Sequence, residues 1–124
     1  MAKLFNLIIG SVAGGLARYW LAGAVYRLFG ASFPYGTLAV NLTGCLVIGF
    51  LASLSDEKFL LGPEAKLLLM VGFCGAFTTF STFMLETANL MKGGEMARAF
   101  LNVLASVVLG FVAFKAGVLL AEII

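Results

Sequence analysis

Apolar residues fill four long stretches of the chain, and turn formers and charged residues separate them. The stretches run from Leu4 to Leu28, from Tyr35 to Leu54, from Ala65 to Met91, and from Met96 to the end of the sequence. Each is at least as long as the roughly 20 apolar residues that a helix needs to cross a bilayer. We therefore predict an all-α integral membrane protein, with four transmembrane helices in a single domain over residues 1–124.

The composition agrees with this pattern and excludes a water-soluble globule. Hydrophobic residues make up 62% of the chain and charged residues 11%, whereas a soluble domain is roughly half apolar and a quarter charged. The net charge is only +2 and the basic residues are scattered, so no nucleic-acid partner is expected. There is no His, and Cys45 and Cys74 lie within apolar stretches as packing residues. We therefore expect neither a transition-metal site nor an enzyme.

The third stretch is longer than a straight crossing requires. Its middle, from Gly72 to Thr79, mixes small residues with hydroxyls. Non-helical backbone at membrane depth is tolerated only where protein or a water-filled cavity covers it. We therefore predict a break in the third helix within this segment.

The basic residues give no preference for one orientation in the membrane. Four spans place the termini and the second loop on one side, with Lys3, Lys58 and Lys66. The other side holds Arg27, Lys92 and Arg98. Three against three leaves the positive-inside rule without effect, so insertion in both orientations is expected. An antiparallel homodimer with dual topology is then the simplest closed assembly.

Thr37 and Asn41 in the second span are four residues apart and share one helical face. An amide in the middle of a membrane is costly unless it is paired. One interpretation is a hydrogen bond between helices, which stabilises by about 1 kcal/mol and needs no function. The other is an ion-binding amide, and the spacing alone does not decide between them.

The third span contains four hydroxyls and three phenyl rings in the seven residues from Phe77 to Phe83. Phe80 and Phe83 share a face, and Thr79, Thr82 and Glu86 form a polar stripe beside them. The rings have a plain interpretation as packing residues. Glu86 is a functional candidate because carboxylates are rare inside spans, but its place near the end of the span also fits an interfacial residue.

In the fourth span, one stripe of small and polar residues consists of Asn102, Ser106, Gly110, Ala113 and Gly117. Close helix packing explains the glycines but not the two polar residues. Arg18 in the first span has two interpretations as well. It either extends to the headgroups or lies in a water-filled vestibule and attracts anions.

The polar groups at membrane depth are mostly amides and hydroxyls, which donate hydrogen bonds without carrying charge. A cation pathway would favour acidic rings, and a proton-coupled transporter a deep carboxylate, but the first two spans contain no acid. This bias favours a small, hard anion that exchanges its water for hydrogen-bond donors. Phenyl edges are the positive part of the ring quadrupole, so the two rings are candidates to line its path.

Three motifs resemble the fluoride ion channel family called Fluc or CrcB, over essentially the whole chain. They are Gly14-x-x-x-Arg18, Gly36-Thr37-Leu38-x-Val40-Asn41-Leu42-x-Gly44, and Gly72-Phe73-x-Gly75-x-x-Thr78-Thr79-Phe80-Ser81-Thr82-Phe83-x-x-Glu86. The resemblance implies a fluoride-selective channel of the cell (inner) membrane, whose passive export of fluoride relieves toxicity. It also implies a dual-topology antiparallel homodimer, with two pores and a structural sodium ion at the centre of its interface.

The resemblance further implies roles for individual residues. Asn41 would hydrogen-bond fluoride, and Phe80 and Phe83 would be the rings that line each pore. The hydroxyl donors along the pore would be Thr37, Thr79, Ser81, Thr82 and Ser106. Gly75 and Thr78 would offer backbone carbonyls to the sodium ion, two from each subunit. Asn102 stands where some relatives carry an aromatic residue, so its role is open.

Two other functions share some of these features. A small four-helix multidrug or cation transporter has the same length and possible dual topology, but it requires a membrane-embedded Glu in the first span. That span offers Arg18 and no acid. A non-transporting subunit would leave Asn41 and the run from Phe77 to Phe83 without a purpose. The fluoride channel is therefore the leading hypothesis.

Overall fold

A computed structural model describes residues 1–124, which form helices and connecting loops without any strand. Four spans are long and apolar enough to cross a membrane. They are α1 (Ala2–Phe29), α2 (Tyr35–Asp56), a composite third span (Pro63–Lys92) and α6 (Met96–Ile123). The four predicted spans are confirmed. The second helix continues two residues beyond Leu54, so the loop to the third span starts after Asp56.

The third span consists of two helical halves. Its first half is built from α3 (Pro63–Lys66), the π-helical segment η1 (Leu67–Cys74) and α4 (Gly75–Phe77), and its second half is α5 (Phe80–Lys92). Between the halves, Thr78 and Thr79 are extended, with φ/ψ of −86°/159° and −150°/118°. The predicted break is confirmed, and it lies at the C-terminal end of the segment where it was expected.

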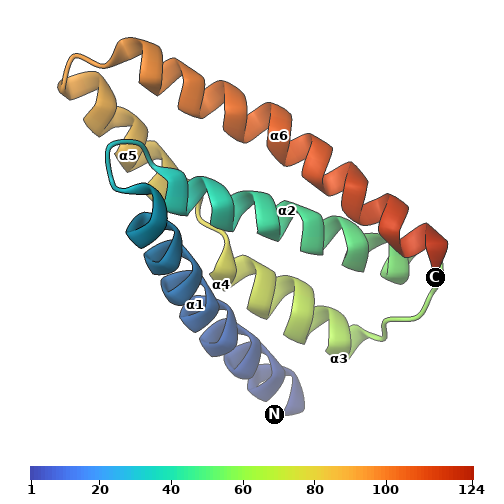
Figure 1. Ribbon diagram of the computed structural model, residues 1–124. Helices are drawn as coiled ribbons and strands as arrows, with labels where there is room; N and C mark the ends of the chain where they lie inside the picture. The colour runs from blue at the N-terminus through green and yellow to red at the C-terminus, as the bar shows by residue number, and fades with distance from the viewer.

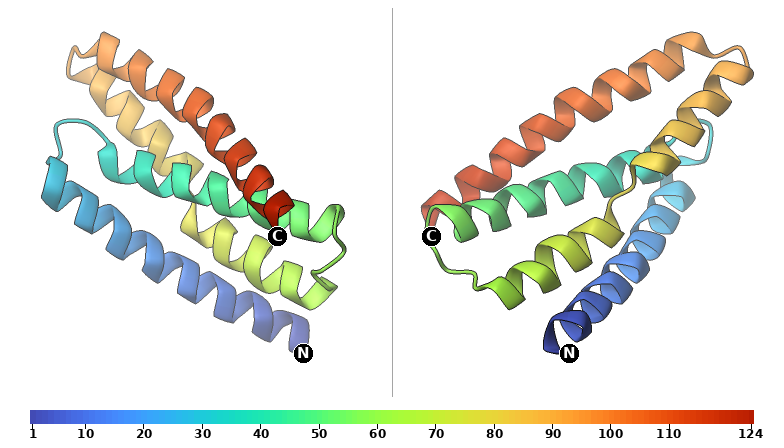
Figure 2. Two further views of the ribbon diagram at one scale, coloured as in Figure 1. Left: turned by 45° about the vertical axis from the view of Figure 1, so that its right-hand side comes forward. Right: turned by 180° about the vertical axis from the view of Figure 1, so that it is seen from behind.

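The helices lie around α2. Figures 1 and 2 show α6 along one side of α2, with η1 and α1 on the other side. The α1–α2 and α5–α6 loops lie at one end of the bundle, and the α2–α3 loop and the two termini lie at the other. The short helix α5 packs mainly against the start of α6. The break in the third span therefore lies in the middle of the bundle, next to α2.

Glycines let neighbouring helices approach closely. A Cβ added to Gly14 of α1 would overlap the carbonyl group of Phe73 in η1, and one added to Gly117 of α6 would overlap that of Leu46 in α2. Small residues are favoured at such interfaces because helices in a membrane associate through van der Waals packing rather than the hydrophobic effect. The close packing predicted for Gly117 is confirmed.

Much of the apolar surface is exposed on the single chain. Only 23 of the 124 residues are buried, and large side chains such as Phe5, Trp20 and Phe111 are more than 60% exposed. Apolar surface of this extent marks contact with lipid or with another protein. Together with the four spans, it identifies a multi-pass membrane protein.

Candidate functional site

The side chain of Asn41 in α2 forms hydrogen bonds with the backbone at the break in the third span. Its Nδ2 group donates to the carbonyl oxygen of Thr79 at 3.0 Å, and its Oδ1 atom accepts from the Thr79 backbone N–H at 2.8 Å. One amide therefore satisfies both backbone groups of a residue that lies outside the helices. A primary amide has two N–H donors, so the second N–H of Asn41 is available to a ligand.

Thr79 begins α5 as its N-cap residue. Its Oγ1 atom accepts from the Thr82 backbone N–H at 3.2 Å and donates to the Thr82 hydroxyl at 3.0 Å. Threonine is a favoured N-cap residue because its oxygen takes up one of the unpaired N–H groups of the first turn. The exposed Ser81 hydroxyl lies 3.4 Å from the same Oγ1 atom. The hydroxyl cluster thus fixes the start of α5.

The break also frees two carbonyl groups. In a continuous helix, the N–H groups of Thr79 and Thr82 would donate to the carbonyl oxygens of Gly75 and Thr78. Here they donate to Asn41 Oδ1 and to Thr79 Oγ1 instead, and no other backbone N–H replaces them. Gly75 and Thr78 both line a cavity. Their carbonyl oxygens are therefore available to an external ligand.

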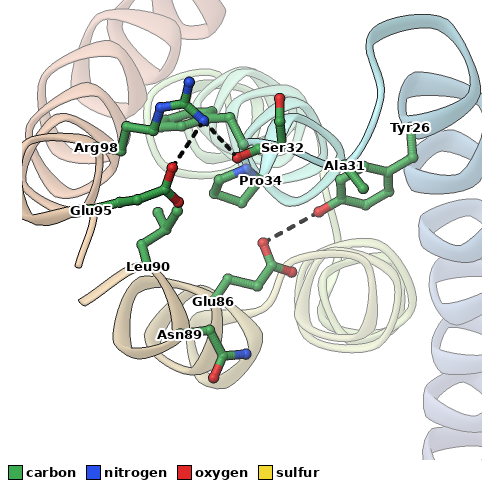
Figure 3. A pocket seen from close by; sticks show the side chains of 10 residues that line it. Tyr26, Ala31, Ser32, Pro34, Glu86, Asn89, Leu90, Glu95 and Arg98 are labelled. Carbon is green, nitrogen blue, oxygen red and sulfur yellow. Dashed lines mark hydrogen bonds and ion pairs between the residues drawn. The ribbon is translucent and has the colours of Figure 1, made fainter. Parts of the chain in front are cut away.

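Glu86 connects α5 with α1 and α2. The Thr37 hydroxyl donates to Glu86 Oε1 at 2.6 Å, and the Tyr26 hydroxyl donates to Glu86 Oε2 at 3.2 Å. The two hydroxyl oxygens are 3.4 Å apart. Figure 3 shows the bond between Tyr26 and Glu86 at the edge of a pocket. Glu86 is half-buried and paired with two donors, so it is not a freely solvated interfacial side chain.

Sequence reasoning missed Tyr26. The residue lies close to the end of the first span, where tyrosines are common as membrane-interface anchors. Its partner Glu86 is 60 positions away in the sequence. No spacing rule relates residues so far apart, so only the packing of α1 and α5 against α2 brings them together.

Two cavities flank the break. The first, of about 380 Å³, is called here the Arg18 cavity, and its polar lining consists of Arg18, Tyr19, Tyr26, Thr37, Thr79, Thr82 and Glu86. The second, of about 390 Å³, is called here the Asn41 cavity, and it is lined by Asn41, Gly44, Cys45, Ile48, Met70, Cys74, Gly75, Thr78, Thr79 and Phe80. Thr79 lines both. Nine of the residues predicted from the sequence therefore gather on the two sides of the break.

The two phenyl rings and the last two hydroxyl candidates, Ser81 and Ser106, differ in how exposed they are. The rings of Phe80 and Phe83 are 5.8 Å apart, but Phe80 is 74% exposed and Phe83 only 7%. Ser81 is exposed beside Phe80. Ser106 is half-buried on α6 and lines neither the Arg18 cavity nor the Asn41 cavity. The single chain thus does not bring Ser106 to the other candidates.

Asn102 has a structural partner. It is 1% exposed, and its Nδ2 group donates at 2.9 Å to the hydroxyl of Thr87 on α5. Thr87 in turn donates to the carbonyl oxygen of Phe83 at 2.7 Å. Asn102 and Thr87 lie on different helices, so no spacing along the chain indicates this pair. Asn102 therefore joins α6 to α5, which fits the interpretation of such amides as links between membrane helices.

The fold and the site define a small multi-pass membrane protein with a broken helix and cavities rich in uncharged hydrogen-bond donors. Residues 5–118 match the family described as CrcB-like protein, Camphor Resistance (CrcB). This chain belongs to that family, as its three motifs indicated.

Relatives of known name match over nearly the whole chain. The fluoride-specific ion channel FluC of Maridesulfovibrio salexigens is 44% identical over 124 residues, which are 100% of this chain and 98% of that protein. The protein of the same name from Geobacter sulfurreducens is 46% identical over 122 residues, or 98% of each chain. The one from Methylococcus capsulatus is 45% identical over 120 residues, which are 97% of this chain and 53% of that protein.

The double hydrogen bond of Asn41 predicts a large effect of its removal on stability. Replacing Asn41 with Leu leaves the N–H and C=O of Thr79 without partners at membrane depth, at a cost of about 1–3 kcal/mol for each group. We expect a clearly lower midpoint of thermal unfolding in detergent. The matched control is Asn89→Leu, because Asn89 is an exposed amide of α5 without a side-chain hydrogen bond. Equal midpoints for the two variants would show that Asn41 does not support the break.

Proposed function

We propose that this chain is a fluoride-specific ion channel that lets fluoride leave the cell passively and so relieves fluoride toxicity. The observation that carries the proposal is the match, over the full length of the chain, to proteins named fluoride-specific ion channels. Membership of the CrcB family agrees with it. Since these relatives are channels, we also infer that transport rather than catalysis is the activity of this chain.

The chemistry of the cavities suits a small anion. Fluoride must exchange its hydration shell for donors, and the second N–H of Asn41 offers one beside Phe80. The Thr82 hydroxyl offers another close to the break, and the exposed Ser81 hydroxyl offers a third once it turns from its 3.4 Å contact with Thr79 Oγ1. Arg18 adds the positive charge that would draw an anion into the Arg18 cavity. We propose that these groups, with Phe80 and Phe83, line the pathway.

The hydroxyl protons of Thr37 and Thr79 are already used in hydrogen bonds within the protein. A hydroxyl has a single proton to donate, and here Thr37 gives its proton to Glu86 while Thr79 gives its own to Thr82. Each hydroxyl must therefore rotate away from its present acceptor before it can donate a hydrogen bond to fluoride. Their proposed roles as pore donors depend on such a rotation.

A homodimer would complete the pathway. Phe80 is 74% exposed on the single chain, and Gly75, also exposed, has open space around its Cα. An exposed ring and an open cavity next to a helix break leave one side of the proposed pathway without a wall. A second copy supplies that wall, and the even distribution of basic residues favours an antiparallel arrangement.

The carbonyl oxygens of Gly75 and Thr78 fit the structural sodium ion that the family resemblance implies. Both lack an N–H donor, and both residues line the open Asn41 cavity. Hard cations prefer oxygen ligands, and unwound helix segments supply such carbonyls. We propose that two carbonyls from each subunit hold the ion between the two copies, where it would link the subunits.

Reconstituted protein should transport fluoride and exclude chloride. In liposomes loaded with both anions, we expect rapid passive loss of fluoride, measured with a fluoride electrode, while chloride is retained. Equal loss of the two anions would overturn the selectivity. Transport that occurs only with a proton gradient and an organic cation would instead support a small multidrug transporter.

Phe80 provides the sharpest test of the proposed pathway. Because its ring is 74% exposed, Phe80→Ile should leave the folded chain intact but lower the rate of fluoride efflux at least tenfold. Phe83 is less suitable because it is 7% exposed, so that its replacement also disturbs packing. The control is Phe100→Ile on α6, since Phe100 is 69% exposed and lies away from both cavities. Equal rates of fluoride efflux in Phe80→Ile and Phe100→Ile would show that Phe80 has no special role in the pathway.

The proposed dual topology predicts one terminus on both sides of the membrane. A C-terminal cysteine tag should react with an impermeant reagent from outside in about half of the molecules and only after permeabilisation in the rest. The two native cysteines lie within spans, so Cys45→Ala and Cys74→Ala remove their background. Labelling from one side alone would contradict the antiparallel dimer.

A further inference from the structure

A third cavity lies beyond the Arg18 cavity, at the end of the bundle. It has a volume of about 560 Å³ and is called here the Arg98 cavity. Figure 3 shows it between the α1–α2 loop, the C-terminal part of α5 and the start of α6. Its lining shares two residues with the Arg18 cavity, Tyr26 and Glu86. These two side chains therefore form the wall between the two cavities.

Arg98 connects the loop and the helix that line the outer part of the Arg98 cavity. Its Nη1 group donates to the carbonyl oxygen of Ser32 at 3.1 Å and lies 3.4 Å from Glu95 Oε1. This ties the α1–α2 loop to α6 and balances the arginine charge with a carboxylate. What remains near the inner wall is the negative charge of Glu86. The carboxylate of Glu86 therefore repels an anion in this cavity unless its side chain is held away from the path of the anion.

The ring of Tyr26 is held in place by α2. A Cβ added to Gly36 would overlap this ring, so the ring rests directly against the backbone of Gly36. Its hydroxyl then reaches Oε2 of Glu86, while Thr37 occupies Oε1. Each oxygen of the carboxylate has one donor. The side chain of Glu86 is thereby fixed between two helices rather than free to turn into either cavity.

We propose that Tyr26 is a positioning residue of the ion pathway. Its hydroxyl holds the Glu86 carboxylate in the wall between the Arg18 cavity and the Arg98 cavity. These two cavities then form one route from the break to the membrane surface, with the Tyr26–Glu86 pair at its narrowest point. Without the Tyr26 hydroxyl, the carboxylate turns into the route and its charge opposes the anion. This inference rests on the proposed fluoride channel function.

The test replaces Tyr26 with Phe, which removes the hydroxyl and keeps the ring. We expect the fluoride conductance of single channels in planar bilayers to fall at least threefold. Conductance distinguishes a positioning role from a merely structural one, because loss of stability lowers the number of active channels and leaves the conductance of each unchanged. Thermal unfolding of both proteins in detergent accompanies the recordings and shows that the variant is folded.

Tyr35→Phe is the matched control. The Tyr35 ring packs against Phe29 and Phe33, with centroid distances of 5.8 and 5.1 Å, and its hydroxyl makes no hydrogen bond within the chain. The same chemical change at this position should leave the conductance at the wild-type value. A fall of the same size in Tyr35→Phe would show that the effect at Tyr26 is not specific.

Infrared spectroscopy tests the hydrogen bond itself. The carboxylate bands of Glu86 are assigned by their disappearance in Glu86→Gln. These bands should shift in Tyr26→Phe, because one oxygen has lost its donor, and should stay in place in Tyr35→Phe. Unshifted bands would show that the Tyr26 hydroxyl does not position the carboxylate.

The outcomes separate this inference from the proposed function. If the wild-type protein conducts fluoride and Tyr26→Phe conducts equally well, the role of Tyr26 is overturned and the channel function stands. If the wild-type protein conducts no fluoride, both are overturned. A lower conductance together with shifted Glu86 bands supports the positioning role.

Discussion

The structure depends on how the non-helical backbone of Thr79 is satisfied inside the membrane. A lipid environment offers no water to backbone groups, and each unsatisfied group there costs several kcal/mol. The Asn41 side chain meets this demand by bonding both the N–H and the C=O of Thr79. Without it, the third span would have to be a continuous helix, and the carbonyl oxygens of Gly75 and Thr78 would be used up by helical hydrogen bonds. The cavities on both sides of the break follow from this one amide.

The position of α5 is a second consequence. Since helices in a bilayer gain little from hydrophobic burial, a half-length helix needs specific polar links. Three such links surround α5: Asn41 at its start, Thr37 and Tyr26 at Glu86, and Asn102 at Thr87. They come from α2, α1 and α6. The polar residues in this chain therefore fix the geometry of the site as well as line it.

Much of the fold could be predicted from the sequence, because long apolar stretches have few alternatives in a membrane. The break could be placed within Gly72–Thr79 because small and hydroxyl residues interrupt an overlong span. Partners across long sequence distances could not be predicted. The bond from Asn41 to Thr79 spans 38 residues and that from Tyr26 to Glu86 spans 60, and helix rotation decides both. Ser106 lies on the same face of α6 as Gly117, which packs closely against α2, and it lines neither cavity.

The hydrogen-bond donors of the site divide into two kinds, and this division bears on how an anion would move. The hydroxyls of Thr37, Thr79 and Tyr26 already have acceptors within the protein, so an anion gains them only by competing with Glu86 or Thr82. The second N–H of Asn41 has no such acceptor. Its amide is also held rigidly by Thr79, so it needs no reorganisation when an ion arrives. A fixed donor beside mobile ones suits conduction, because binding must be strong enough to replace water at one point and weak enough elsewhere for the ion to leave.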